Sequence, residues 1–260
     1  KVFPERQKLK RDSYRSRWWR HAEPQLALYR GLRDRAFVFV HSMISPHLAL
    51  ARVSARQVFA NSLDVIVEDR LAFFSVMQSR VHETWARFLG SSMKDDLRYT
   101  PSDCFETFPF PGSWETAAAL EARGTEYYSA RAEAMVRSGE GLTKTYNRFH
   151  DPDETSADIL RLRALHDLMD RAVLDAYGWT DLRPTCEFLL DYEDEGDEDD
   201  ESGRARQRKK PWRYRWPDDI RDEVLARLLD LNAKRAEEER LAGKAAAAKP
   251  AMKSASGRSR

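Results

Sequence analysis

Two arginines near the start of the chain stand among aromatic residues in a strongly basic segment. Arg15 and Arg17 are interleaved with Tyr14, Trp18 and Trp19. Cations in such a setting can bind phosphates while the rings stack on or support a nucleic-acid ligand. The alternative is a solvated segment that is anchored by two core tryptophans.

A second basic pair flanks a turn between two expected strands. Arg52 and Arg56 lie on either side of Ser54-Ala55. The arginine fork makes paired hydrogen bonds to guanine in the major groove, so both residues are candidates for contact with base edges. The alternative is that they are ordinary surface residues. His41 and His47 flank a proline turn nearby, but no acidic or cysteine partner stands at ligand spacing, so the sequence favours no metal site.

A third basic pair, Lys94 and Arg98, follows the end of an expected helix at a place where a loop can approach a ligand. Asp95 and Asp96 lie between them and argue against a simple phosphate cradle. These carboxylates can instead pair with Arg98 or accept a hydrogen bond from a cytosine amino group.

The elements that position these residues are predicted by periodicity. Apolar residues recur every three or four positions from Leu71 to Leu89, Phe88 included, which predicts one amphipathic helix ending at Gly90. The phenylalanines that follow alternate with polar or proline positions up to Pro111, and we expect them to form a packed, strand-like strap. Upstream, short β-rich pieces separated by turn signals predict strands at 36–43, 48–53, 58–61 and 65–67.

Beyond Pro111 the pattern becomes helical. Helices are expected from Trp114 to Arg137, with Ser113 as N-cap, from Ser156 to Tyr177, and from Ile220 to about Leu241. A loop is expected at 142–152. The aromatic and arginine-rich stretch at 211–217 is expected either to dock on the body of the protein or to touch nucleic acid.

The fold class predicted is therefore α+β, with an N-terminal mixed domain of short antiparallel strands and a long helix, followed by a mainly α-helical C-terminal region. We expect the first domain at 1–112, incomplete at its N-terminus, and a helical domain at 113–192. An acidic and then basic disordered insert follows at 193–210, a C-terminal helix at 211–242 and a flexible tail at 243–260.

Three motifs follow one another in the central part of the chain: Ser79-Arg80-Val81-His82-x-x-Trp85, Lys94-Asp95-x-x-Arg98-Tyr99 and Phe105-x-Thr107-Phe108-Pro109-x-Pro111. This pattern resembles a segment of large DNA adenine methyltransferases, the single-chain type II restriction-methylase enzymes and their relatives in the BREX and DISARM phage-defence systems. In that family the segment closes the target-recognition domain, which follows the methyltransferase core. A second block, from Leu142 to Trp179, is similar to the region C-terminal to that domain.

The catalytic motifs that this resemblance would imply are missing from the sequence. An adenine methyltransferase of this class needs Asn-Pro-Pro-Tyr or Asn-Pro-Pro-Phe to bind the flipped base, and no two prolines are adjacent here. There is no glycine-rich turn after a strand to hold S-adenosylmethionine, and no nuclease cluster of two carboxylates and a lysine. His82-Glu83 begins like a zinc-protease helix, but position 86 is Ala. We therefore assign no catalytic residue and no metal site.

The function predicted is the DNA-recognition portion of an adenine-N6 DNA methyltransferase, with Arg15, Arg17, Arg52, Arg56, Lys94 and Arg98 contacting double-stranded DNA. The resemblance implies S-adenosylmethionine as the cofactor of the parent enzyme, with none in this chain. It also implies the methyltransferase core of the same parent as a partner, and defence-system proteins as further possible partners. The main rival is a non-catalytic protein-interaction subunit without DNA binding, and an independent hydrolase is a third hypothesis.

Composition agrees with a protein that works in water. Charged residues make up 33% of the 260 residues, the mean hydropathy is −0.70, and no apolar run approaches the ~20 residues of a membrane span. The lack of such a run predicts no membrane partner. Cys104 and Cys186 are far apart and lack a partner motif, which favours the reducing cytoplasm. The chain begins at Lys1 rather than Met, and we expect it to be a fragment of a longer protein.

Overall fold

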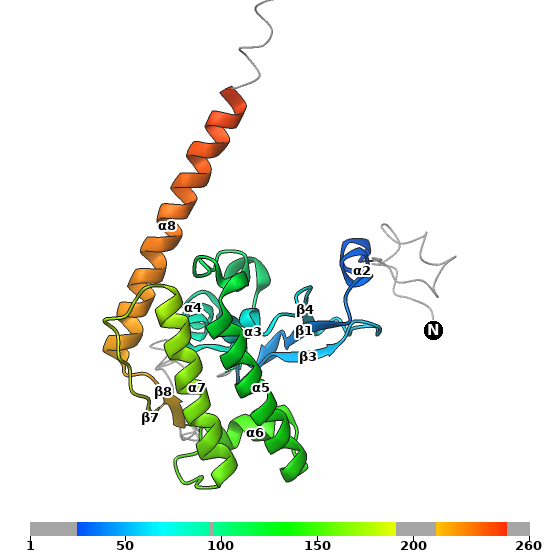
Figure 1. Ribbon diagram of the computed structural model, residues 1–260, viewed down its shortest axis with the longest axis vertical. Coiled ribbons are helices and arrows are strands. Elements are labelled where there is room, and N and C mark those ends of the chain that lie inside the picture. Colours follow the sequence, from blue (N-terminus) through cyan, green and yellow to red (C-terminus); the bar gives the residue numbers. More distant parts are fainter. Residues whose placement is uncertain (1–24, 94–95, 191–211, 249–260) are drawn as a thin grey trace, which may run out of the picture.

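The computed structural model describes residues 25–93, 96–190 and 212–248. Small antiparallel sheets form the first part of the chain and helices dominate the rest, so the predicted α+β class is confirmed (Figure 1). The basic N-terminal segment, the charged insert and the end of the tail lie outside the described residues. Within those residues, no helix combines the length and the apolar character needed to cross a membrane.

The first sheet places β1 (Phe37–Ser42) between β3 (Ala51–Ser54) and β4 (Leu63–Ile66), with both neighbours antiparallel to it. Alternation along β1 sends its side chains to two faces. Val38 and Val40 pack in a small core with the short helix α2 (Leu26–Leu32). Phe39 points the other way and stacks near Phe74, at 5.7 Å between ring centroids. The prediction of a strand at 58–61 was wrong, since residues 58–60 have no regular structure and Asn61 lies in the turn before β4.

A second small sheet continues from the first. β2 (Ile44–Ser45) and β5 (Ser91–Met93) both pair antiparallel with β6 (Asp96–Arg98), which lies between them. Only Met43 separates β1 from β2, so the chain passes directly from the first sheet into the second.

The helix predicted from Leu71 to Leu89 is two helices, α3 (Leu71–Gln78) and α4 (Arg80–Leu89). Ser79 breaks it by adopting an extended backbone with ψ 158°. The Ser79 hydroxyl donates to the Val76 carbonyl at 2.7 Å and accepts from the His82 backbone N–H, so it caps the second helix. Phe88, expected on the buried face, is 53% exposed.

The phenylalanine strap packs as expected but is not a strand. A π-helix runs from Pro101 to Phe105, and the chain continues without regular structure to the prolines. Phe108 is buried, with its ring 4.7 Å from His82 and 5.0 Å from Phe110. Proline cannot donate to a strand ladder, and two prolines here leave the chain free to follow the ring packing instead.

A 3-10 turn (Trp114–Thr116) precedes the helices α5 (Ala118–Ser138), α6 (Leu142–Phe149) and α7 (Ala157–Ala176). Ser113 begins the 3-10 turn with a φ of 54° and makes no side-chain cap. The loop expected at 142–152 was wrong over most of its length, because α6 packs Tyr146 and Phe149 into the core. One core cluster joins Phe39, Phe74 and Leu162, so the sheet region and the helices share their interior.

The last three elements begin in contact with the rest of the protein, and the end of the last helix extends away from it. β7 (Glu187–Leu190) pairs antiparallel with β8 (Trp212–Arg215), so the aromatic and arginine-rich stretch docks on the protein as one of its two alternatives predicted. α8 (Asp218–Ala248) buries Val224 and Leu228 against the core and then projects away from it (Figure 1). It extends beyond the end expected near Leu241, and its Leu229 side chain is 40% exposed.

Candidate nucleic-acid interface

Arg52 lies on β3 directly opposite Phe39, on the face of the sheet that meets the helices. Its guanidinium carbon sits 4.4 Å from the centroid of the Phe37 ring, and the Tyr128 hydroxyl donates to its backbone carbonyl at 3.3 Å. The residue is half-buried. The attraction between a cation and an aromatic face is weak. Arg52 would have to give up its contact with the Phe37 ring in order to bind a ligand.

Arg56 and Arg98 are exposed. Arg56 follows β3 and its backbone N–H donates to the Ser54 hydroxyl at 3.2 Å, in the loop that leads toward β4. Arg98 ends β6, where it faces Ile44 on one neighbouring strand and Ser91 on the other. Both positions present an arginine at the surface, as base or phosphate contact requires.

The predicted basic residues do not gather at one point among the described residues. Arg52 is opposite Phe39, and Arg98 is opposite Ile44, five residues further along. At ~3.3 Å per residue this separates them by roughly 16 Å along the strand direction. Arg56 lies beyond Arg52, at the far end of the sheet. Arg15, Arg17 and Lys94 lie outside the described residues.

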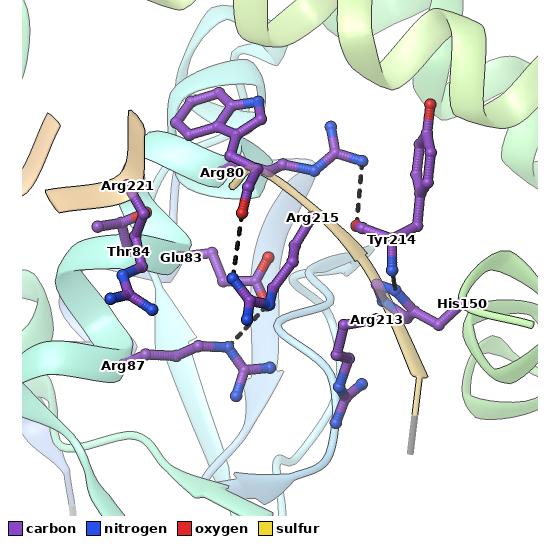
Figure 2. A pocket seen from close by; sticks show the side chains of 10 residues that line it. Arg80, Glu83, Thr84, Arg87, His150, Arg213, Tyr214, Arg215 and Arg221 are labelled. Carbon is purple, nitrogen blue, oxygen red and sulfur yellow. Dashed lines mark hydrogen bonds and ion pairs between the residues drawn. The ribbon is translucent and has the colours of Figure 1, made fainter. Parts of the chain in front are cut away.

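The structure brings together a different set of arginines, which we call the arginine pocket. Its lining contains five arginines and one carboxylate, together with four neutral side chains (Figure 2). Its cavity volume is about 20 Å³. The lining residues are Arg80, Glu83, Thr84, Arg87, His150, Arg213, Tyr214, Arg215, Trp216 and Arg221.

Arg80 is the most firmly held member of the pocket. Its side chain is 4% exposed, and its Nη1 lies 2.5 Å from Asp170 Oδ2 and 3.0 Å from Asp167 Oδ1. The Arg80 backbone N–H also donates to Asp170. Burial of Asp170 favours its neutral acid, but His166 and Arg80 outweigh this and hold its pKa below the ordinary value. The pair is therefore ionic and joins α4 to α7.

The outer arginines are paired with more exposed acids. Arg215 and Arg221 both contact Asp218 Oδ1, at 2.6 and 2.7 Å, and Arg221 also contacts Asp222 at 2.7 Å. Arg87 pairs with Glu83 one turn earlier in α4, at 2.9 Å. Arg87, Arg213, Arg215 and Arg221 make contacts beyond these.

Arg213 is buried and approaches the pocket from β8. Its Nη1 lies 2.8 Å from Nδ1 of His47, whose Nε2 lies 2.7 Å from Asn147 Oδ1. Burial lowers the pKa of His47 to about 4, an effect that Asn147 opposes and Arg213 adds to. His47 is thus neutral and its two ring nitrogens are occupied, which agrees with the absence of any three-residue metal cluster in the described part of the chain.

The pKa of Glu83 shows how the neighbouring arginines act on a carboxylate in the pocket. Burial disfavours its ionised form, yet Arg87, Arg213 and Arg80 hold the pKa of this carboxyl below its usual value. The arginines around Glu83 thus favour a negative charge on its carboxyl group. The arrangement suits an oxyanion.

The sequence did not single out the pocket, because α4 is separated from the adjacent elements β8 and α8 by more than a hundred residues. Arg80 and Arg87 lie on α4, Arg213 and Arg215 on β8, and Arg221 on α8. The available signal was the alternation of arginine with aromatic residues around Tyr214. No strand was predicted at 211–217, and such an alternation would not show what a strand there packs against.

Comparison with known proteins matches residues 27–112 to the family described as "MmeI, target recognition domain". The chain is similar to DNA methyltransferase A of Bacillus subtilis (strain 168), at 26% identity over 132 residues, which are 50% of this chain and 14% of that protein. It also resembles the solved structure of the type IIL restriction-modification enzyme MmeI in complex with DNA. That likeness has a TM-score of 0.52 and 18% identity, and covers 78% of this chain and 22% of MmeI.

The chain thus spans less than a quarter of the length of either relative. The likeness to MmeI, at 18% identity, is a likeness of fold. The family match includes the first sheet, α3, α4 and the phenylalanine strap, and ends before α5.

Proposed function

Since residues 27–112 match the family described as "MmeI, target recognition domain", we propose that this chain is the DNA-recognition portion of a site-specific adenine DNA methyltransferase. Its work would be to hold duplex DNA and read a short sequence, so that one adenine is presented to a catalytic core outside this chain. The family match is the observation that carries the proposal. The fold shared with MmeI, which was solved with DNA bound, supports it.

The parent enzyme would use S-adenosylmethionine as methyl donor, and its methyltransferase core would be the first partner of this chain. No Asn-Pro-Pro motif is present here, so the methyl transfer would take place on that core. We place the parent in a restriction-modification or phage-defence system, where further defence proteins would be partners. Its substrate is DNA, so we place it in the cytoplasm.

Among the predicted contacts, Arg56 and Arg98 fit the proposal best because both are exposed. Arg52 would act only after leaving the Phe37 ring. Arg15, Arg17 and Lys94 remain proposed contacts from the sequence. We also propose 1–112 as the recognition domain and 113–192 as the helical domain, although the two share one core cluster.

Selection from a randomised duplex library tests recognition directly. The 260-residue chain should enrich a short motif, and Arg56→Ala or Arg98→Ala should relax the preference at single positions. A lost arginine contact to a base should weaken binding to the selected duplex by about 1–3 kcal/mol. Arg161→Ala is the matched control, since Arg161 is an exposed arginine on α7 paired with Glu133.

Enrichment of no motif, together with stable binding of a partner protein, would favour the rival hypothesis of an interaction subunit. Loss of the motif in the Arg161 variant as well would show that the selection does not report on the recognition region.

A further inference from the structure

We propose that the arginine pocket binds a backbone phosphate of the duplex, at a place separate from the predicted base-reading arginines. The inference rests on the proposed function, because it takes DNA as the ligand. It adds a contact made partly by β8 and α8, which lie outside the matched residues 27–112.

The composition of the pocket is what selects an oxyanion. Five arginines and one carboxylate line the pocket (Figure 2). Arginine stays protonated at any physiological pH, and its planar fork matches the oxygens of a phosphate.

The arginines divide into a fixed base and a reachable rim. Arg80 is 4% exposed and is committed to Asp170, while Arg213 is 4% exposed and is held against His47. The side chains of Arg87, Arg215 and Arg221 are 15%, 12% and 23% exposed. A phosphate would therefore bind the rim, over a base whose arginines are held by other groups of the protein.

The acids that hold Arg215 and Arg221 are suited to exchange, whereas Arg87 is held by Glu83, which itself lines the pocket. Asp218 and Asp222 are 60% and 63% exposed, and neither lines the pocket. Ion pairs with such exposed carboxylates contribute little net stability. A phosphate at the rim can share Arg215 and Arg221 with them at small cost, and the Arg80–Asp170 pair beneath stays intact.

The size of the cavity further limits which ligands can bind in it. A volume of about 20 Å³ accommodates roughly one water-sized group, so a base or nucleoside does not fit inside. Phosphate oxygens that project from a continuous backbone do fit at the mouth. Phosphate contacts of this kind fix the register of a protein on the duplex and carry no sequence information.

The test compares two arginines on the same helix. Arg221 lines the pocket and is 23% exposed, whereas Arg227 is 28% exposed, is paired with Asp181 and Glu223, and does not line it. Duplex affinity is measured by fluorescence anisotropy across a salt series. Arg221→Gln should raise Kd about 3–10-fold and reduce the salt slope by about 0.9, the value for one lost phosphate contact. Arg227→Gln should change neither.

Two further variants and a measurement of folding serve as controls for this comparison. Arg221→Lys keeps the charge without the fork and should recover part of the affinity. Arg87→Gln tests the opposite side of the rim and should repeat the loss. Thermal unfolding of each variant confirms that the fold is intact.

Failure of the pocket can be distinguished from failure of the proposed function. Salt-dependent binding by the wild type, with Arg221→Gln indistinguishable from Arg227→Gln, overturns the pocket alone. No duplex binding by the wild type overturns both. If inorganic phosphate raises the Tm of the wild type but not of Arg221→Gln, while duplex affinity is equal in both, the pocket takes a small anion and the DNA assignment is overturned.

Discussion

The Arg80 side chain links the matched recognition region to the helices that follow. Its guanidinium and its backbone N–H both bind the Asp170 carboxylate, and its ring neighbours include Tyr214 at 5.1 Å. A buried ion pair of this kind contributes specificity of packing more than net stability, but the loss of one partner leaves a buried charge.

Asp170→Asn should therefore lower the free energy of unfolding by about 3–5 kcal/mol, the usual cost of breaking a buried pair. Urea unfolding at pH 7 measures the change. Asp230→Asn is the control, because Asp230 pairs with Lys234 on the exposed surface of α8 and its loss should cost under about 0.5 kcal/mol. Equal effects of the two substitutions would contradict the structural role given to Arg80.

The buried side chain of His41 leads to a second prediction, which concerns the pH dependence of stability. Burial and His82 lower its pKa to about 4, which the backbone of His47 offsets only in part, and neither ring nitrogen has a partner of normal hydrogen-bond geometry among the described residues. As pH falls below 6.5 the unfolded chain protonates first, so stability is lost between pH 6.5 and about 4.

His41→Phe removes this proton linkage and keeps a ring against Tyr99. Between pH 7.5 and pH 5, the wild type should lose about 2 kcal/mol more than the variant does. Chemical unfolding at the two pH values measures the difference. An unchanged pH dependence would mean that His41 is not buried as a neutral group.

Candidate residues were predictable from the sequence only in part. Exposure of Arg56 and Arg98 agrees with a surface role, because each stands beside a turn or a strand end. The Arg52 prediction ignored its strand register, which places it on the face toward the helices and over Phe37. The arginine pocket could not be predicted, since a local pattern does not show that α4, β8 and α8 meet.

At the scale of elements, the spacing of apolar residues along the sequence predicted where helices lie, but it did not predict where a helix is broken. The helix expected from Ser156 to Tyr177 is found at Ala157–Ala176, because its apolar face is long and regular. The Ser79 break was missed because apolar spacing continues through it, while the capping bond that favours it is made by one hydroxyl. α6 was missed because its threonines and asparagine are poor helix formers and its stability comes from packing.

The contact between α3 and α5 depends on Gly124. A Cβ there would lie 2.2 Å from the Leu71 carbonyl oxygen and 2.6 Å from Ser75 Oγ. Gly124→Ala should therefore destabilise the protein by about 1–3 kcal/mol through overpacking, despite the better helix propensity of alanine. The midpoint of urea unfolding measures this.

Gly243→Ala is the matched control, since Gly243 lies in α8 with nothing within 4 Å of the added atom. It should leave stability unchanged or raise it by up to about 1 kcal/mol. A Gly124 variant as stable as the control would mean that the two helices do not approach so closely.

The whole molecule is a small sheet region and a helical region joined by a shared core, with α8 extending from one side (Figure 1). The α+β class and the order of sheet then helices were predictable, because they follow from a change of hydrophobic period along the chain. The joint core was not, since it depends on long-range contacts such as Phe74 with Tyr127. This joining is what lets α4 serve both the recognition region and the arginine pocket.

The most direct test of the central claim is the salt dependence of duplex binding by the 260-residue chain. The account predicts measurable affinity at about 50 mM salt and a linear fall of log K with log salt, since phosphates bound by arginine and lysine release counterions. No detectable binding at that salt concentration, or an affinity independent of salt, would contradict it.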